Sequence, residues 1–322
     1  MAKGQKQGAQ GVRFVSIAQD RDGQRIDNFL ASELKGVPKS HIYRILRRGE
    51  VRVNKGRIAP KYRLRTGDIV RLPPLRQSAS IAPVRPAVES LEWIESRILY
   101  EDERLIVLNK TSGVAVHGGS GQSLGAIELL RAARPQAPSL ELVHRVDKDT
   151  SGCLMIAKKR SMLRLLHEIF RSQQIDKRYL TLLQGKWRGG QQTVKLRIRK
   201  NVLRSGERVV RVSDDGKESE SIFKPVKTYP QASLVEVRII TGRTHQIRVQ
   251  AAELGRPVAG DTKYGSREFN RLMRGYGLRR LFLHAVSIAF ILPGSNEKFR
   301  ITAPLSDDLQ AVLDNLDQGL AK

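Results

Sequence analysis

A proline-rich stretch, PPLRQSASIAPVRPAVES at residues 73–90, interrupts the periodic patterns of this sequence. Proline blocks helices and central strands, and the serines and alanines around it offer little surface to bury. Because a single hydrophobic core cannot run through such a segment, we expect a semi-extended linker over residues 76–92. It separates a small folded unit, residues 13–75, from a large one, residues 93–322, and the polar, glycine-rich residues 1–12 are expected to be a disordered tail.

The two units differ in charge. The 322 residues carry 58 Lys and Arg against 32 Asp and Glu, a net charge of +26, and residues 1–86 hold 19 of these cations and 6 of the acids. A surplus of this size favours an anionic partner. Nucleic acid fits better than a membrane, because no apolar run approaches the roughly 20 residues of a membrane span. The single cysteine, Cys153, allows no internal disulfide, which is typical of a cytoplasmic protein.

The small unit shows two helical patterns followed by short strands. RIDNFLASELKG and KSHIYRILRRGE have apolar residues at helical spacing, with Ser40 as the predicted N-cap of the second helix, and VRVNKG and RLRTGDIVRL read as strands with turns. A solvated face is the usual explanation of a basic run, but the density of this one and its hairpin context favour an RNA- or DNA-binding surface. Its basic residues are Arg44, Arg47, Arg48, Arg52, Lys55 and Arg57.

Three segments of this unit carry a resemblance. RIDNFL, SHIYRILRRGEVRVNKGRI and RTGDIV resemble the alpha-L RNA-binding domain that was first described in a ribosomal protein of the small subunit. The resemblance covers roughly residues 20–73. It implies that the small unit binds structured RNA.

In the large unit, strand patterns outnumber helical ones and do not alternate strictly with them. An amphipathic helix is expected over residues 161–174, with Ser161 as its N-cap. The strand candidates are ILYEDERLIVLNK, YLTLLQGKW, SIFKPVKTY, ASLVEVRII and LFLHAVSIAF. This pattern predicts an α+β fold with a large mixed or antiparallel sheet flanked by helices and loops.

One segment of the large unit, HRVDKDTSG at residues 144–152, sets two acids in a strongly basic context. Asp147 lies in a loop between two strand patterns, where functional side chains are commonly displayed. An aspartate before a Thr-Ser-Gly turn also often bonds only the local backbone, and the motif by itself favours that structural role.

A second motif, TGRTHQIR at residues 241–248, spans the end of a strand and the start of a helix. Arg243 and Arg248 stand at that start, where the helix dipole adds positive potential. A carboxylate packed against such an arginine stays ionised even when it is buried. A phosphate or sulfate contact at the helix start is the alternative.

Two further elements have ambiguous roles. Tyr179 heads a strand after a basic turn, although tyrosine belongs more often to a core than to a catalytic site. The stretch LNKTSGVAVHGGSG, which contains Lys110 and His117, ends in a glycine-rich loop that either approaches a phosphate backbone or simply turns. The sequence has no phosphate loop, no dinucleotide fingerprint and no metal-ligand spacing among its six histidines. We therefore expect an enzyme without cofactor or metal, if the chain is an enzyme.

Taken in chain order, these motifs resemble one family. HRVD..TSG, K.Y and GRTHQIR, after an alpha-L domain, are similar to the pattern of the RluA-type pseudouridine synthases, over residues 13 to about 305. The layout is most similar to the RluC members, which act on large-subunit (23S) ribosomal RNA. The resemblance implies an isomerase that detaches uracil from carbon 1′ of its ribose, rotates the base and rejoins it through carbon 5.

The resemblance also implies residue roles. The essential aspartate is Asp147, acting either as a nucleophile on the sugar or as a base at carbon 2′. Because base chemistry needs the target flipped out of its helix, Arg145 matches the residue that takes its place. Arg248 matches the residue that keeps the aspartate ionised, with Arg243 as a second candidate. Tyr179 matches the aromatic residue against the flipped base, and Ile247 walls the pocket.

Two alternatives compete with this interpretation. A non-catalytic ribosomal or RNA-binding protein would use the same basic surface but would not need the Asp147, Arg248 and Tyr179 set. A DNA-binding protein is suggested by charge alone, and competition between RNA and DNA at matched salt would test it. The predicted partner is ribosomal RNA, free or in an assembling subunit, with neither DNA nor a membrane as partner and a monomer as the simplest state.

Overall fold

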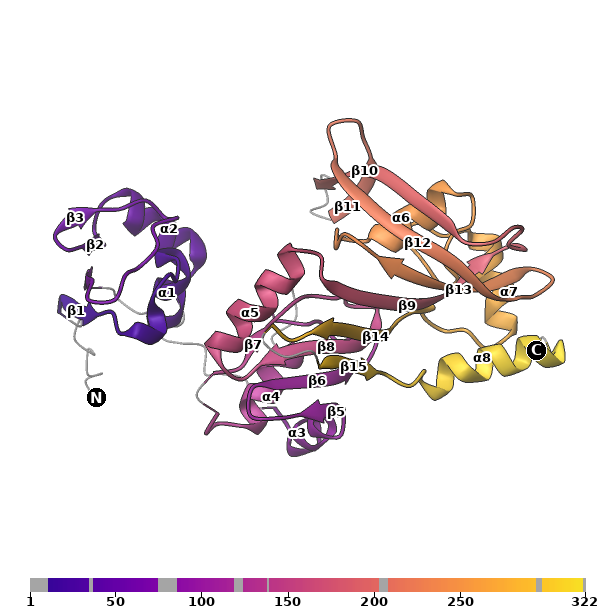
Figure 1. Cartoon of the computed structure of the whole chain (residues 1–322), viewed down its shortest axis with the longest axis horizontal. Coiled ribbons are helices and arrows are strands. Elements are labelled where there is room, and N and C mark those ends of the chain that lie inside the picture. The colour runs from indigo at the N-terminus through magenta and orange to yellow at the C-terminus, as the bar shows by residue number, and fades with distance from the viewer. Residues whose placement is uncertain are drawn as a thin grey trace, which may run out of the picture. The chain divides into compact units, whose positions relative to one another are not determined.

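The structure, a computed structural model, describes residues 11–34, 37–74, 86–118, 124–137, 139–202, 208–293 and 297–320 (Figure 1). It divides into two compact units, Met1–Val84 and Arg85–Lys322. Most of the predicted tail and of the predicted linker lies outside the described residues. Within the described part of the chain, no helix is long and apolar enough to cross a membrane.

The N-terminal unit packs two helices on a four-stranded sheet. Its elements are β1 (Arg13–Ser16), the 3-10 helix η1 (Gln19–Arg21), α1 (Ile26–Glu33), α2 (Lys39–Arg47), β2 (Arg52–Val53), β3 (Gly56–Arg57) and β4 (Ile69–Leu72). The strand order is β1-β4-β2-β3. Phe29 of α1 and Ile42 of α2 share one core with Val70 of β4, as the helical and alternating patterns predict. The Ser40 prediction is wrong: Pro38 precedes the helix, which begins at Lys39, so Ser40 already lies in the first turn.

Eleven strands of the large unit form one mixed sheet. They are β5 (Ile98–Glu101), β6 (Leu105–Lys110), β7 (Glu141–Leu142), β8 (Ser151–Ala157), β9 (Ile175–Gln184), β10 (Gln192–Val202), β11 (Arg208–Val212), β12 (Lys217–Thr228), β13 (Ala232–Ile239), β14 (Leu283–Ile291) and β15 (Lys298–Thr302). The order is β11-β10-β12-β13-β9-β14-β8-β6-β5, with β15 beside β14 and β7 beside β8. Of the described strand pairs, β8–β14 is parallel and the others are antiparallel.

Helices cover both faces of this sheet. They are α3 (Val88–Glu95), α4 (Ala126–Ala133), α5 (Arg160–Arg171), α6 (Gln246–Glu253), α7 (Arg267–Gly275) and α8 (Asp307–Gln318). All seven residues of β8 are buried. Met155 and its neighbours in alternation face the α5 side, whereas Leu154 and Ile156 face the α4 side, and α7 and α8 pack over β9 and β13. The α+β prediction with a large mixed sheet is confirmed.

Two helix starts differ from the sequence-based expectation. α5 begins at Arg160 after Lys159, so Ser161 lies inside the first turn and is not the N-cap. Two residues connect β8 to this helix, and the second, Lys159, has the extended backbone of the N-cap position. The predicted linker ended at residue 92, but α3 already begins at Val88, and it buries Ile94 in the core that it shares with α4.

The parallel pairing of β8 with β14 depends on a glycine. Gly152 has a φ of +101°, and a Cβ there would lie 2.3 Å from the carbonyl oxygen of Ala285. Only glycine allows this backbone conformation and this approach. The contact fixes the start of β8, and with it the loop before β8, against the middle of the sheet.

Candidate active site

The loop between β7 and β8 carries Asp147. Its backbone is bonded to the segment after β6: Gly113 N–H donates to the carbonyl of Lys148 at 3.0 Å, and Ser112 Oγ donates to the carbonyl of Asp149 at 2.7 Å. Val146 is buried in the core beneath the loop. Since neighbouring side chains of an extended segment point to opposite sides, the Val146 anchor directs Arg145 and Asp147 outward.

Lys110 joins these two segments from inside. It is 2% exposed, and its Nζ donates to the carbonyls of Thr111, Val114 and Lys148 at 2.8 to 2.9 Å. Burial lowers the pKa of Lys110 to about 7, although Asp149 and Asp147 oppose the shift. The expectation that Lys110 contacts RNA is therefore corrected: its ammonium is enclosed, and it positions the loop that carries Asp147.

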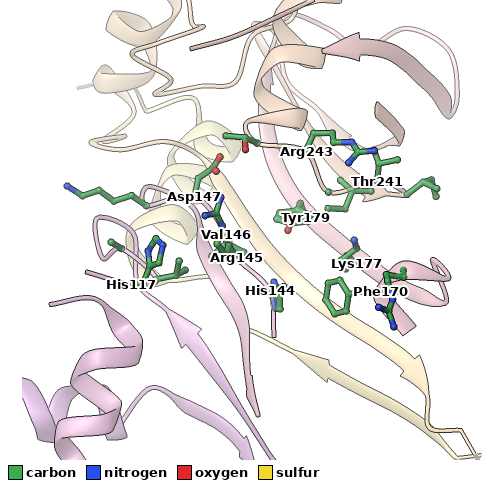
Figure 2. Close-up of a pocket in the computed structure, with 18 of the residues that line it drawn as sticks. His117, His144, Arg145, Val146, Asp147, Phe170, Lys177, Tyr179, Thr241 and Arg243 are labelled. Carbon is green, nitrogen blue, oxygen red and sulfur yellow. The ribbon is translucent and has the colours of Figure 1, made fainter. Parts of the chain in front are cut away.

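A pocket of about 850 Å³ opens beside this loop (Figure 2). It lies between the loop, the C-terminal end of α5, β9 and the segment after β13. Five of its lining residues are cations: Arg145, Lys148, Arg171, Lys177 and Arg243. Among the described lining residues Asp147 is the single carboxylate, and no hydrogen bond or ion pair within the described chain reaches its carboxylate oxygens. The pocket is a cationic hollow around one free acid, large enough for a nucleotide.

β9 brings Tyr179 and Lys177 to the same pocket, two residues apart on one face of the strand. Burial, and then the charge of Asp147, raises the pKa of Tyr179, so its hydroxyl stays protonated. Burial lowers the pKa of Lys177 to about 8, and its Nζ lies 5.2 Å from the ring centroid of Phe170. Figure 2 shows Tyr179 across the pocket from Asp147, with Lys177 and Phe170 further from the acid.

Arg248 reaches the site from α6 and is held by an acid of its own. Its Nε and Nη2 donate to the two carboxylate oxygens of Asp261 at 2.7 and 2.8 Å. Burial alone would lower the pKa of Arg248, but the hydrogen bonds and charge of Asp261, together with the charge of Asp147, outweigh it and raise the pKa. Arg248 therefore remains a cation near Asp147, although its side chain donates its two hydrogen bonds to Asp261.

His245 and Tyr264 complete this side of the site. His245 has a φ of +52°, an uncommon left-handed conformation for a residue other than glycine. Its Nδ1 lies 2.8 Å from the hydroxyl of Tyr264, which also accepts a hydrogen bond from the backbone of Val210. The guanidinium carbon of Arg248 lies 5.1 Å from the centroid of the Tyr264 ring. Burial lowers the pKa of His245, which favours the neutral ring.

The structure brings most of the candidate residues together. Arg145, Asp147, Tyr179 and Arg243 line both the large pocket and a smaller cavity of about 70 Å³ beside it, to which Ile247 and Arg248 contribute. His117 lines the large pocket and is exposed. The six basic residues of the N-terminal unit, Arg44, Arg47, Arg48, Arg52, Lys55 and Arg57, are all exposed.

Sequence reasoning missed Asp261, Tyr264 and the enclosed Lys177. The arginine of TGRTHQIR pointed to a carboxylate partner, but nothing in the chain order marked Asp261 as that partner. For metal binding, no group of three or more His, Cys, Asp or Glu side chains with suitable geometry occurs in the part of the chain that the structure describes.

The fold and the pocket define a class of protein: a large unit with one acid in a cationic pocket, joined to a small basic unit. The profile of the RNA pseudouridylate synthase family matches residues 104–253, and that of the S4 domain matches residues 24–70. The chain belongs to the RNA pseudouridylate synthase family. The sequence-based predictions of an isomerase of this class and of an RNA-binding domain are confirmed.

Individual relatives cover nearly the whole chain. Ribosomal large subunit pseudouridine synthase C of Pasteurella multocida (strain Pm70) is 54% identical over 305 residues, which is 94% of each chain. The protein of the same name in Escherichia coli (strain K12) is 53% identical over 308 residues, 95% of this chain and 97% of the relative. A structure of human RNA pseudouridylate synthase domain containing 1 is similar with a TM-score of 0.56 and 25% identity, covering 69% of this chain and 93% of that chain.

Proposed function

We propose that this enzyme converts specific uridines of large-subunit (23S) ribosomal RNA to pseudouridine, with Asp147 as its essential residue and no cofactor. One observation carries the catalytic part of the proposal: Asp147 is the single carboxylate among the described residues of a pocket that is lined by five cations and bordered by Tyr179. The choice of RNA is supported by the relatives that bear the large-subunit name over 94–97% of their length.

The proposed reaction is balanced without a co-reactant. The bond between N1 of uracil and carbon 1′ of the ribose breaks, the base rotates, and a new bond forms between carbon 5 and carbon 1′. The hydrogen on carbon 5 leaves as a proton, and N1 takes up a proton. Asp147 acts at the ribose, as nucleophile at carbon 1′ or as base at carbon 2′, and both routes require the ionised carboxylate.

The surrounding side chains prepare this chemistry. Flipping the target out of its helix costs a few kcal/mol, and the guanidinium of Arg145, exposed at the pocket rim, fills the vacated position by stacking and hydrogen bonding. Tyr179 lies against the flipped base. Arg248 places a positive charge near Asp147, and Ile247 forms part of the apolar wall.

The remaining cations bind the RNA backbone. Arg243 is held in place because its Nε donates to the carbonyl of Glu218 at 3.0 Å, and it faces the pocket together with His117. The N-terminal unit adds affinity through its exposed arginines and lysine. We propose a monomer that acts in the cytoplasm on free ribosomal RNA or on an assembling subunit, with neither DNA nor a membrane as its partner.

Transcripts of large- and small-subunit ribosomal RNA, labelled with tritium at carbon 5 of uridine, test the substrate. Release of tritium from the large-subunit transcript, at one or a few mapped positions, is the expected result. Release from the small-subunit transcript at an equal rate, or from neither transcript while an assembled particle is also inert, would contradict the proposed substrate.

A further inference from the structure

The sheet of the N-terminal unit has one face that its helices leave uncovered, since α1 and α2 share a core with the other face. On the uncovered face, Phe14 of β1 lies opposite Arg71 of β4, and Arg71 lies opposite Arg52 of β2. Arg52 in turn lies opposite Arg57 of β3. We call this row of four side chains the outer sheet row. It crosses all four strands with an aromatic ring at one end and three arginines behind it.

The aromatic end of the row is unusually exposed. Phe14 is 67% exposed and Ile69, its neighbour on β4, is 50% exposed, although both could have been buried in a core. Phe14, Ile69, Arg52, Lys55 and Arg71 line a hollow of about 1060 Å³. The hollow therefore has an apolar floor surrounded by cations. A surface that only carries solvated charge would not leave this apolar area exposed to water, so the hollow indicates a binding site.

The arginines of the row are fixed but not neutralised. Arg71 Nη1 donates to the carbonyl of Glu50 at 2.9 Å, and Arg52 Nε lies 3.3 Å from the carbonyl of Gly49. The side chain of Arg57 packs closely over Gly49: a Cβ on residue 49 would lie 2.7 Å from Nε of Arg57. Among the described residues, no acidic side chain pairs with Arg52, Arg57 or Arg71. Their remaining N–H donors are available to an anion.

We propose that the outer sheet row binds an unpaired segment of RNA, with one base stacked on Phe14 and the adjoining phosphates on Arg71 and Arg52. A base offers a flat π-face and its backbone offers anions, which matches an aromatic side chain followed by arginines. Three interstrand spacings make the row about 14 Å long, room for more than one nucleotide. An apolar protein surface is a poorer occupant, because it would remove water from the unpaired arginines and offer them no anion in exchange.

This site lies in a different unit from the pocket of Asp147, and its role is to select RNA with an unpaired nucleotide. The test uses the full chain and two labelled RNA hairpins of equal length, one with a bulged nucleotide and one fully paired. Binding is measured by fluorescence anisotropy, which does not require turnover. The outcome is therefore independent of the proposed isomerisation.

We expect Phe14→Ala to weaken binding of the bulged hairpin about tenfold, with little effect on the paired hairpin, and Phe14→Trp to restore binding because stacking is regained. Arg71→Gln should weaken binding of both hairpins and reduce the slope of log K against log salt concentration by about one, the value for one lost phosphate contact. The matched control is Val88→Ala in the large unit, since Val88 is 66% exposed; it should change neither affinity.

Three results would overturn the inference. Phe14→Ala without effect would mean that RNA does not occupy the row. An equal loss on both hairpins would mean that the row recognises backbone only. A loss that Phe14→Trp fails to restore, in a protein of unchanged thermal stability, would rule out stacking as the cause.

Discussion

Replacing Asp261 with alanine should destabilise the large unit far more than an ordinary ion-pair deletion. The side chains of Arg248 and Asp261 are 6% and 0% exposed, and the two groups are joined by two hydrogen bonds. Asp261 also accepts hydrogen bonds from the backbone N–H groups of Lys263 and Tyr264. Its removal leaves a buried guanidinium without its partner, which costs about 3–5 kcal/mol.

The matched control is Asp308→Ala. Asp308 makes a similar two-bond pair with Arg280, at 2.6 and 3.1 Å, but its side chain is 56% exposed. Water can solvate what remains after that deletion, so the loss should stay below about 1 kcal/mol. Burial is the main difference between the two pairs.

Urea denaturation followed by tryptophan fluorescence measures both variants. The two tryptophans, Trp93 and Trp187, lie in the large unit, so their emission reports its unfolding alone. A loss of 3–5 kcal/mol corresponds to a Tm lower by roughly 10 °C for a unit of this size. Equal and small losses for Asp261→Ala and Asp308→Ala would refute the reasoning.

The pH dependence of the Asp261 effect has a defined sign. Burial raises the pKa of Asp261, but the Arg248 hydrogen bonds and charge outweigh burial and lower it overall. A carboxyl group with a folded pKa below its unfolded pKa stabilises the protein above the unfolded value, and the contribution is lost as pH falls through the folded value. The difference between wild type and Asp261→Ala should therefore be equal at pH 6 and pH 8 and shrink only in acid.

Three further substitutions test other parts of the site. Lys177→Met should raise stability at pH 7 by up to about 3 kcal/mol and lose that advantage near pH 10.5. The reason is that burial lowers the folded pKa of Lys177 from 10.5 to about 8, so the unfolded chain binds more protons between these two pH values. Urea midpoints at pH 7 and pH 10.5 check it. Gly152→Ala should lower the free energy of unfolding of the large unit by more than about 1 kcal/mol, because the added Cβ would meet the carbonyl oxygen of Ala285. The same urea assay measures it, and a variant as stable as the wild type would contradict the close approach. Lys110→Met should lower kcat more than RNA affinity, because it releases the loop of Asp147; a loss of RNA affinity alone would restore Lys110 as an RNA contact.

Local patterns were sufficient for much of the fold. The helical spacing of Ile26, Phe29 and Leu30 predicted α1, because these residues form its buried face, and the apolar run in ASLVEVRII predicted β13, most of which is buried. The helix starts at Ser40 and Ser161 were predicted wrongly. A capping side chain is only a weak preference, and the connection from the preceding residues decides where the first turn begins.

Contacts between distant segments could not be predicted. Motif order and a family resemblance pointed to Asp147, Tyr179 and Arg243, which the fold places around one pocket. The bond between Arg248 and Asp261 and the enclosure of Lys110 depend on how loops pack in three dimensions. A lysine beside a glycine-rich loop has the same sequence signature whether it faces RNA or binds three carbonyls inside the protein.

The role of Asp147 is best measured by tritium release from large-subunit ribosomal RNA labelled at carbon 5 of uridine. Wild type is compared with Asp147→Ala, with no cofactor added. Asp147 is half-buried and its carboxylate has no hydrogen-bonding partner among the described residues, so the substitution, which keeps the backbone bond from Thr150 N–H, should leave folding and RNA binding intact. The account predicts release by the wild type and none by Asp147→Ala at equal RNA affinity. Release by Asp147→Ala at the wild-type rate would contradict it.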